Sequence, residues 1–237
     1  MQPFLGEFMG TLVLVLLGDA VVANVLLNKT KGNNSGWLVI TAGWGFAVMV
    51  GVFVAGAFGS PDGYINPAVT LWSVFGSGDT SKLILIPAQF AGAFVGAVLV
   101  WIQYLPHWKE TANKEAKLAV FCTGPAIRNA PANLMSEIIG TTVLLVGVGA
   151  IFSKIEPQLA VGIGPYLVGV LVWAIGLSLG GTTGYAINPA RDLSPRIAHA
   201  LLPIAGKGSS DWGYAWIPVV GPCIAAAIAW AIFKFIA

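Results

Sequence analysis

The sequence predicts an all-α membrane protein, in which six transmembrane helices and two re-entrant half-helices form an inverted internal repeat. Three observations lead to this prediction. Of the 237 residues, 57% are hydrophobic and 9% are charged, whereas a soluble domain carries about 25% charged residues. Six apolar runs are long enough to cross a bilayer, which takes about 20 residues each. Two shorter segments, each opening with Asn-Pro, stand in matching places of the two halves.

The predicted crossings follow the apolar runs between polar breaks. The first run contains Glu7 and has no basic segment before it, so we interpret it as a membrane span rather than a signal peptide. The six runs lie near residues 4–27, 37–58, 83–105, 134–153, 163–181 and 214–235. Segments 67–76 and 189–202 are too short to cross, and we expect them to be half-helices.

An internal duplication gives the predicted topology. Residues 7–11 (EFMGT) resemble residues 137–141 (EIIGT), and residues 63–68 (GYINPA) resemble residues 184–190 (GYAINPA). Each half holds three crossings, so the second copy must enter the membrane from the opposite face. Inverted repeats of this kind place the functional site near the midplane, at the broken helices.

Composition argues against several other classes of function. The net charge is +2 and the basic residues are scattered, which does not fit a nucleic-acid-binding surface. The two cysteines have neither metal-ligand spacing nor a disulfide pattern, and neither histidine has a metal-ligand companion. The sequence has no Gly-x-Ser-x-Gly elbow, no His-Glu-x-x-His motif and no carboxylate pair at catalytic spacing. We therefore expect no enzyme activity, no metal and no cofactor.

The two Asn-Pro-Ala motifs are the candidate centre of the site. They consist of Asn66, Pro67 and Ala68 in the first repeat and of Asn188, Pro189 and Ala190 in the second. Asn is a good helix cap and Pro a good first helical residue. In an inverted repeat the two half-helices meet tip to tip, with their positive dipole ends facing each other. The Asn amides would donate into a lumen and interrupt a proton wire in water, while the helix dipoles and Arg191 would repel cations.

Irregular backbone precedes each motif. Such backbone is tolerated at membrane depth only where it lines a cavity or is buried in protein, so its carbonyl groups are expected to line one wall of a pore. The pore-lining loop residues would be Gly63, Tyr64, Ile65, Gly184, Ala186 and Ile187. Glu7 and Glu137, at equivalent repeat positions, are expected to support these loops as hydrogen-bond acceptors. Asp19, also inside the first span, is left unassigned.

Asn66-Pro67-Ala68-Val69-Thr70 and Asn188-Pro189-Ala190-Arg191 resemble the signature pair of the major intrinsic protein (aquaporin) family, over nearly the whole chain. The resemblance implies a bundle of six helices and two half-helices, one pore per subunit, and a homotetramer. Asp192 and Pro218 resemble markers of the aquaglyceroporin, or glycerol facilitator, branch. The expected organisation is a single channel domain at 1–237, with repeat 1 at about 1–106, a linker loop at about 107–132 and repeat 2 at about 133–237.

The same resemblance assigns Trp44, Gly176, Tyr185 and Arg191 to the selectivity filter. The two rings would face the carbon chain of a polyol, Arg191 would donate to its hydroxyls, and Gly176 would leave the width that a histidine removes in water-selective members. Two positions depart from the family pattern. Tyr64 stands where His is usual, and Tyr185 where many glycerol facilitators carry Phe.

The expected function is a passive channel for water, glycerol and similar small neutral solutes such as dihydroxyacetone, urea and undissociated lactic acid, which excludes ions and protons. A water-selective aquaporin is the main alternative, disfavoured by Gly176 and Asp192. A gated secondary transporter would need a coupling-ion site at Asp19, Glu7 or Glu137. A purely structural junction protein also stays open.

The expected location is a prokaryotic plasma membrane, with several crossings and a cytoplasmic N-terminus. The orientation rests on the family resemblance alone. Basic residues oppose it, because Lys82, Lys154 and Lys234 lie on the predicted cytoplasmic side, against seven Lys and Arg residues in the outer loops.

Overall fold

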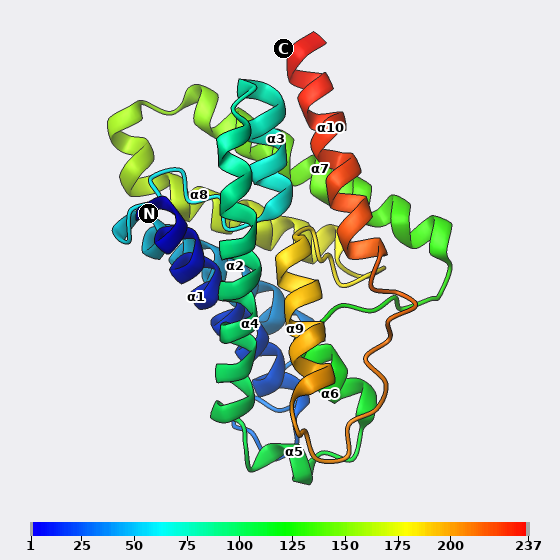
Figure 1. Cartoon of the computed structure of the whole chain (residues 1–237). Helices are drawn as coiled ribbons and strands as arrows, with labels where there is room; N and C mark the ends of the chain where they lie inside the picture. Colours follow the sequence, from blue (N-terminus) through cyan, green and yellow to red (C-terminus); the bar gives the residue numbers. More distant parts are fainter. Residues whose placement is uncertain (1, 236–237) are drawn as a thin grey trace.

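Six long helices form the body of the protein (Figure 1). The structure is a computed structural model, and it describes residues 2–235. The six are α1 (Gln2–Leu26), α2 (Trp37–Ala57), α4 (Leu85–Gln103), α7 (Ala130–Lys154), α8 (Pro157–Leu179) and α10 (Ile217–Phe235). By length and composition, all six crossing segments are apolar enough to span a membrane. The prediction of six spans in an all-α membrane fold is therefore confirmed.

Two shorter helices begin at the Asn-Pro motifs. They are α3 (Pro67–Ser77) and α9 (Pro189–Leu201), and in each the preceding Asn caps the first turn while Pro occupies the start. Figure 1 shows α3 toward the end of the molecule where the C-terminus lies and α9 toward the other end. The half-helices therefore lie on opposite sides of the centre, as the inverted repeat requires.

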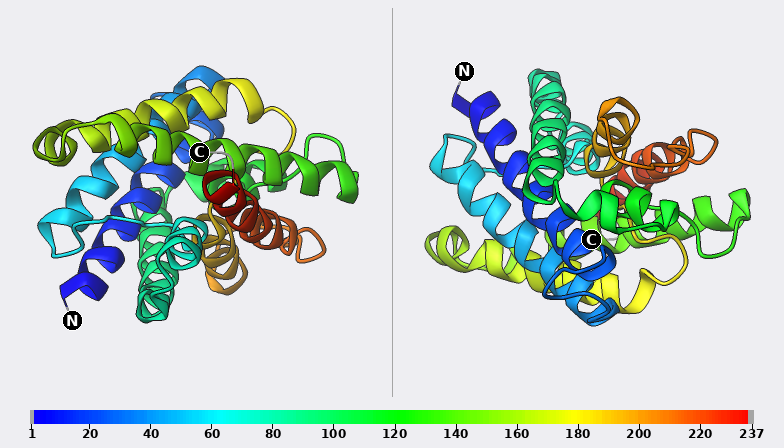
Figure 2. Two further views of the ribbon diagram at one scale, coloured as in Figure 1. Left: turned by 90° about the horizontal axis from the view of Figure 1, so that it is seen from above. Right: turned by 90° about the horizontal axis from the view of Figure 1, so that it is seen from below.

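The two repeats pack side by side, and each half-helix contacts a spanning helix of the other repeat (Figure 2). Helix α1 packs against α2 and α4, and α7 packs against α8 and α10. Across the repeats, α3 packs against α10, and α9 packs against α4. Each half-helix is thus held by a spanning helix of the other repeat, which joins the two halves into one structure.

Two predicted helix starts are too late, and one connection holds more structure than expected. Helix α7 begins at Ala130 rather than near 134, because Asn129 caps it and Pro131 favours the first turn. Helix α8 begins at Pro157 rather than near 163, again with proline in the first turn. The linker predicted at 107–132 contains the short helices α5 (His107–Glu110) and α6 (Lys114–Phe121). A 3-10 turn, η1 (Thr80–Ile84), precedes α4.

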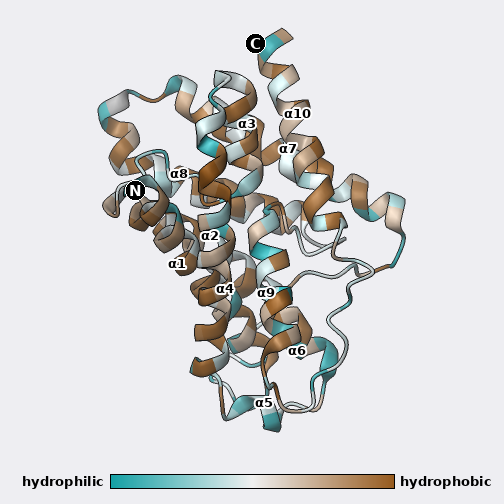
Figure 3. Ribbon diagram, in the orientation of Figure 1, coloured by the Kyte–Doolittle hydropathy of each residue, from teal (hydrophilic) through white to brown (hydrophobic). Residues whose placement is uncertain are grey.

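The polarity of the surface fits a lipid environment. Figure 3 shows that most residues of the long helices are apolar (brown), whereas polar residues (teal) are concentrated at α5 and in the connections. Large apolar side chains such as Phe46, Ile139, Val143 and Ile228 are exposed on the spanning helices. In a bilayer such side chains face hydrocarbon, so their exposure carries no cost of hydration.

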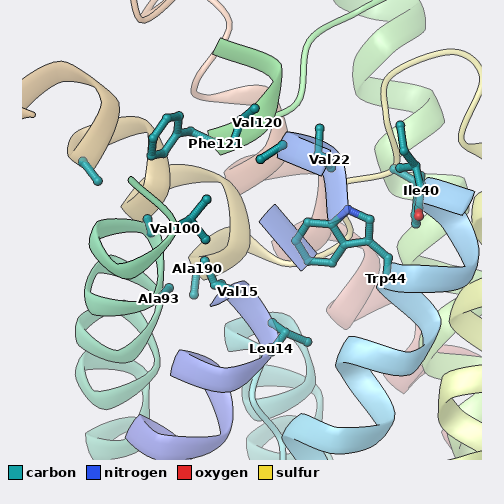
Figure 4. Close-up of a cluster of buried hydrophobic side chains, with 14 of the residues drawn as sticks. Leu14, Val15, Val22, Ile40, Trp44, Ala93, Val100, Val120, Phe121 and Ala190 are labelled. Carbon is teal, nitrogen blue, oxygen red and sulfur yellow. The ribbon is translucent and has the colours of Figure 1, made fainter. Parts of the chain in front are cut away.

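The buried apolar cluster joins helices of both repeats. Figure 4 draws part of it, and its labelled members include Leu14 and Val15 of α1, Trp44 of α2, Val100 of α4, Phe121 of α6 and Ala190 of α9. This cluster fixes α9 against α1 and α4. The first residues of the second half-helix are therefore positioned by helices of the first repeat.

Helices α2 and α8 meet at a pair of glycines. A Cβ atom built on Gly169 would lie 2.7 Å from the carbonyl oxygen of Gly45, and a Cβ on Gly45 would lie 2.7 Å from the carbonyl oxygen of Gly169. Neither backbone oxygen can move without moving its helix. Small residues allow this close approach of helices in lipid, and here they set the separation of two helices that border the site.

We predict that Gly169→Ala destabilises the protein by about 1–3 kcal/mol, because the added methyl group overpacks the α2–α8 contact. Thermal unfolding of the purified protein in detergent measures the effect. Gly162→Ala, in the same helix, is the matched control, since a Cβ there meets no atom within 4 Å. Equal unfolding temperatures for the two variants would contradict the predicted role of the Gly45–Gly169 contact.

Candidate functional site

A continuous cavity of about 690 Å³ runs through the region where the repeats meet. Asn66 and Asn188 border it in the middle. Trp44, Tyr185 and Arg191 border the part near the linker (residues 107–132), and Pro61, Asp62, Tyr64 and Phe152 border the part near the two chain ends. The cavity therefore contacts both re-entrant loops and both half-helix tips, which is the arrangement of a pathway through a membrane.

Glu7 holds the first re-entrant loop. Its Oε1 accepts hydrogen bonds from the Ser60 hydroxyl at 2.6 Å and from the Tyr64 N–H at 2.9 Å. Its Oε2 accepts from the Ile65 N–H at 2.7 Å and from the Gln89 amide at 2.7 Å. The carboxylate is fully buried, and four donors offset the cost of burying it. Glu7 thus supplies the loop with the acceptors that water would otherwise provide.

Glu137 holds the second loop in the same way. Its Oε1 accepts from the Thr183 hydroxyl at 2.7 Å and from the Ala186 N–H at 3.0 Å, and its Oε2 accepts from the Ile187 N–H at 2.9 Å. The residue is also fully buried. Each repeat therefore contributes one glutamate from its first helix to its own loop.

The residues before the two Asn-Pro motifs are strained. Ile65 has φ 44° and Ile187 has φ 45°, a left-handed conformation that β-branched residues rarely adopt. Such strain costs of order 1–3 kcal/mol at each residue. The backbone N–H of each isoleucine is the group that the glutamate carboxylate accepts. The carboxylates therefore hold both loops in a conformation that they would not otherwise keep.

The half-helix tips are joined directly across the centre. The side chain of Asn66 donates to the carbonyl oxygen of Ile187 at 2.8 Å, and that of Asn188 donates to the carbonyl oxygen of Ile65 at 2.9 Å. The amide oxygens cap their own helices, Asn66 through Ala68 at 2.9 Å and Asn188 through Ala190 at 3.0 Å. Since an amide has two N–H donors, each Asn keeps one for the cavity that it borders.

The part of the cavity near the linker is bordered by two aromatic rings and a guanidinium. The guanidinium carbon of Arg191 lies 3.9 Å from the centre of the Trp44 ring, and Tyr185 borders the same space. Gly176 is not among the residues that border the cavity. A Cβ on Gly176 would lie 2.7 Å from the Tyr185 ring, so this glycine gives Tyr185 room to lie back from the lumen.

Two groups partly balance the buried charge of Arg191. Its Nη1 donates to the carbonyl oxygen of Phe121 at 3.4 Å and lies 3.7 Å from the carboxylate of Asp19. Asp19 is fully buried, and its oxygens make no hydrogen bond within the described part of the chain. Sequence analysis left Asp19 unassigned. An acidic residue inside an apolar span did indicate a special role for Asp19, but its position beside Arg191 follows only from the fold.

Asp192 fastens the outer linker to the second half-helix. One oxygen accepts from the N–H and the hydroxyl of Thr123, each at 2.7 Å, and the other accepts from Arg196 at 2.8 and 3.0 Å. Thr123 is two residues from Phe121, whose carbonyl accepts from Arg191. Asp192 therefore helps to place that carbonyl. Pro218, the other predicted branch marker, is buried near the start of α10.

Gly18 is a residue of the site that sequence analysis missed. A Cβ on Gly18 would lie 2.2–2.4 Å from the Trp44 ring, so the indole can lie where it does only because α1 has no side chain there. The sequence held no specific signal for this contact, since it contains 30 glycines. The contact depends on the crossing of α1 and α2.

None of the cysteines and histidines that the structure describes borders the cavity. Within residues 2–235, no group of three or more His, Cys, Asp and Glu residues could hold a metal ion. Burial raises the pKa of the Cys122 thiol well above its usual range, which disfavours the reactive thiolate. His199 Nδ1 lies 2.8 Å from the Ser210 hydroxyl, and His107 Nδ1 lies 2.9 Å from the Asn28 carbonyl oxygen.

Comparison with known proteins places this geometry in a family. The family model described as "Major intrinsic protein" matches residues 1–233. A glycerol uptake facilitator protein of Streptococcus pneumoniae is 55% identical over 236 residues, which cover 99% of each chain. A D/L-lactic acid transporter of Lactiplantibacillus plantarum is 41% identical over 242 residues, covering 99% of this chain and 98% of the other.

A solved structure agrees with these relatives. The aquaglyceroporin from Plasmodium falciparum superposes with a TM-score of 0.80 at 26% identity, covering 99% of this chain and 96% of the other. The similarity extends over both repeats, so it includes the cavity, the two loops and both half-helices.

We predict that Glu137→Gln loosens the second re-entrant loop. The amide of Gln keeps one acceptor oxygen and turns the other into a donor, which leaves a loop N–H without a partner at a cost of about 1–3 kcal/mol. Hydrogen–deuterium exchange of the segment 183–190 should therefore become faster. Glu115→Gln, at an exposed position on α6, is the control. Unchanged exchange in the Glu137 variant would show that the loop does not depend on this carboxylate.

Proposed function

The chain belongs to the major intrinsic protein family, and from this premise we propose that it is a passive channel through which glycerol and similar small neutral solutes cross the membrane. It acts by providing a path and performs no chemical reaction. Relatives named for glycerol uptake match it over almost the whole of both chains, and the solved aquaglyceroporin has the same fold.

The observation that carries this proposal is the set of side chains around the cavity near the outer linker. Trp44 and Tyr185 offer apolar ring surface, and Arg191 offers N–H donors on another side. A polyol has a carbon chain on one side and hydroxyl groups on the other. The opening is therefore complementary to glycerol, because it can exchange the hydration of the hydroxyls for hydrogen bonds while the carbon chain meets the rings.

The same groups account for the exclusion of ions. An ion would have to leave its water and enter a cavity with few polar groups, which is costly in a low-dielectric region. The positive ends of α3 and α9 meet at the centre, and Arg191 lies at the outer opening, so cations face an additional barrier. Each central Asn donates to the oxygen of a passing water or solute. This interrupts the hydrogen-bonded chain of waters along which a proton would otherwise move.

The alternatives have specific difficulties. A water-selective channel needs a narrow filter. Here the filter is wide, because Gly176 leaves room for the Tyr185 ring to lie away from the lumen. A secondary transporter needs a site for a coupling ion, but Glu7 and Glu137 are occupied by their loops, and Asp19 is fully buried beside Arg191. A structural junction protein would have no need for the cavity.

The proposed assembly and location follow the family resemblance. We infer a homotetramer in which each subunit holds its own pore, in the plasma membrane of a prokaryote, with the N-terminus in the cytoplasm. Exposed apolar side chains on α2 and α8, such as Phe46 and Val170, are compatible with burial between subunits. No partner beyond lipid, water and neutral solutes is expected.

Stopped-flow light scattering on proteoliposomes tests the proposed function. Vesicles exposed to glycerol shrink by water loss and then recover as glycerol enters. We expect recovery much faster than in empty vesicles, with entry of sucrose unchanged because sucrose is too large for the filter. Recovery no faster than in empty vesicles would refute the proposal. Lactic acid uptake at low pH, measured with the same vesicles, tests the solute of the L. plantarum relative.

We predict that Gly176→His lowers glycerol permeability about tenfold relative to water permeability, a rise in the barrier of about 1.4 kcal/mol. The imidazole would push Tyr185 toward the lumen, since even a Cβ comes within 2.8 Å of its hydroxyl. The two permeabilities are measured on the same proteoliposomes. Gly181→His is the control, because a Cβ at Gly181 meets no atom within 4 Å. A glycerol-to-water ratio equal to that of the control would mean that Gly176 does not set the filter width.

A further inference from the structure

A chain of hydrogen bonds runs along one side of the cavity near the chain ends. The Lys82 ammonium donates to the Ser73 hydroxyl at 2.8 Å, the Ser73 and Tyr64 hydroxyls are 2.9 Å apart, and the Tyr64 hydroxyl donates to the Asp62 carboxylate at 2.9 Å. The Lys82 nitrogen also lies 5.7 Å from the centre of the Tyr64 ring. Asp62 and Tyr64 border the cavity.

The chemistry of the groups gives this chain one direction. Lysine can only donate and an ionised aspartate can only accept. The single proton of Tyr64 is used on Asp62, so Ser73 must donate to Tyr64 while it accepts from Lys82. The Tyr64 oxygen is therefore engaged both as donor and as acceptor. Only its ring remains to meet a solute.

The chain also connects three separate segments. Asp62 and Tyr64 belong to the first re-entrant loop, Ser73 lies on α3, and Lys82 lies on η1 between α3 and α4. The backbone N–H of Tyr64 is held independently by Glu7. With the backbone and the hydroxyl both fixed, the phenol ring cannot turn away without breaking at least one hydrogen bond. A wall of this kind has a definite width.

We propose that Tyr64 is a second size-selecting residue of the pore, at the mouth opposite Trp44 and Arg191, and that Ser73 and Lys82 are positioning residues that keep its ring in place. The proposal rests on the proposed function, since it concerns which neutral solutes the channel admits. Apart from Asp62, whose Oδ2 accepts from Tyr64, the other side chains at this mouth, Phe53 and Phe152 among them, are apolar, so this end selects mainly by shape.

The expected specificity is against polyols longer than glycerol. A longer polyol can fold into more conformations that are wider than glycerol, and the fixed ring excludes those conformations. A pocket that accommodates or rejects one carbon unit discriminates by about 10–200-fold at most. A single wall residue in a pore open at both ends should contribute the lower part of that range.

The test compares entry of glycerol, erythritol and xylitol into proteoliposomes by stopped-flow light scattering. For Tyr64→Ala, we expect the xylitol-to-glycerol permeability ratio to rise about tenfold, because the wall is removed. For Tyr64→Phe and Ser73→Ala, which keep a ring but break the chain, we expect a smaller rise of about two- to threefold. Ser73→Thr retains the hydroxyl and should restore the wild-type ratio.

Ser153→Ala is the matched control, because Ser153 is exposed on α7 and its hydroxyl bonds only within its own helix. The ratio separates selection from stability, since fewer folded channels would lower all three rates by the same factor. A wild-type ratio in Ser73→Ala and Tyr64→Phe would overturn the role of the chain, and a wild-type ratio in Tyr64→Ala would overturn the proposal as a whole. Absence of glycerol entry in the wild type would instead refute the proposed function, and this inference with it.

Discussion

The structure depends on satisfying the backbone of two irregular loops where no bulk water reaches. A helix satisfies its own N–H and C=O groups, but the residues before Asn66 and Asn188 cannot. Glu7 and Glu137 solve this problem, since a carboxylate accepts several hydrogen bonds and each takes two consecutive loop N–H groups. The loop carbonyls are then free to face the cavity or the opposite Asn. The position of the half-helix tips, and with them the width of the pore, follows from these two side chains.

The hydrogen bonds to the glutamates also correct the alignment of the two repeats. By sequence, Tyr64 matches Tyr185, because both follow glycine. By hydrogen bonding, the partner of Tyr64 is Ala186, since the N–H of each donates to Oε1 of its glutamate. The second loop has one more residue between its glycine and its Asn, which moves Tyr185 out of register. Tyr185 therefore borders the cavity beside Trp44 and Arg191, whereas Tyr64 borders its opposite end, so the duplicated sequence yields two different surroundings for the cavity.

Much of the fold could be predicted because it rests on local signals. Apolar length identifies the spans, and Asn followed by Pro marks the starts of α3 and α9. The start of α8 was misplaced because glycines weaken the helical signal after Pro157. The contacts of Gly18 with Trp44 and of Asp19 with Arg191 could not be predicted, because each depends on how α1 crosses elements far away in the sequence. For the same reason the sequence named Tyr64 as unusual but gave no hint of Ser73 and Lys82.

The buried charge of Arg191 is only partly neutralised, and this partial neutralisation meets two opposing requirements. An unpaired guanidinium would be costly at this depth, but one with every N–H taken could not bind a solute. Both balancing contacts, to Phe121 and Asp19, involve Nη1, and no hydrogen bond within the described part of the chain uses Nη2 or Nε. The guanidinium has five N–H groups, so those on Nη2 and Nε remain for hydroxyls in the lumen. Asp19 lies at 3.7 Å rather than in close contact, which reduces the charge without blocking the donors. In the proposed channel, a neutral polyol would therefore meet a group that can still donate, while the nearby Asp19 carboxylate reduces the charge enough for the arginine to stay buried.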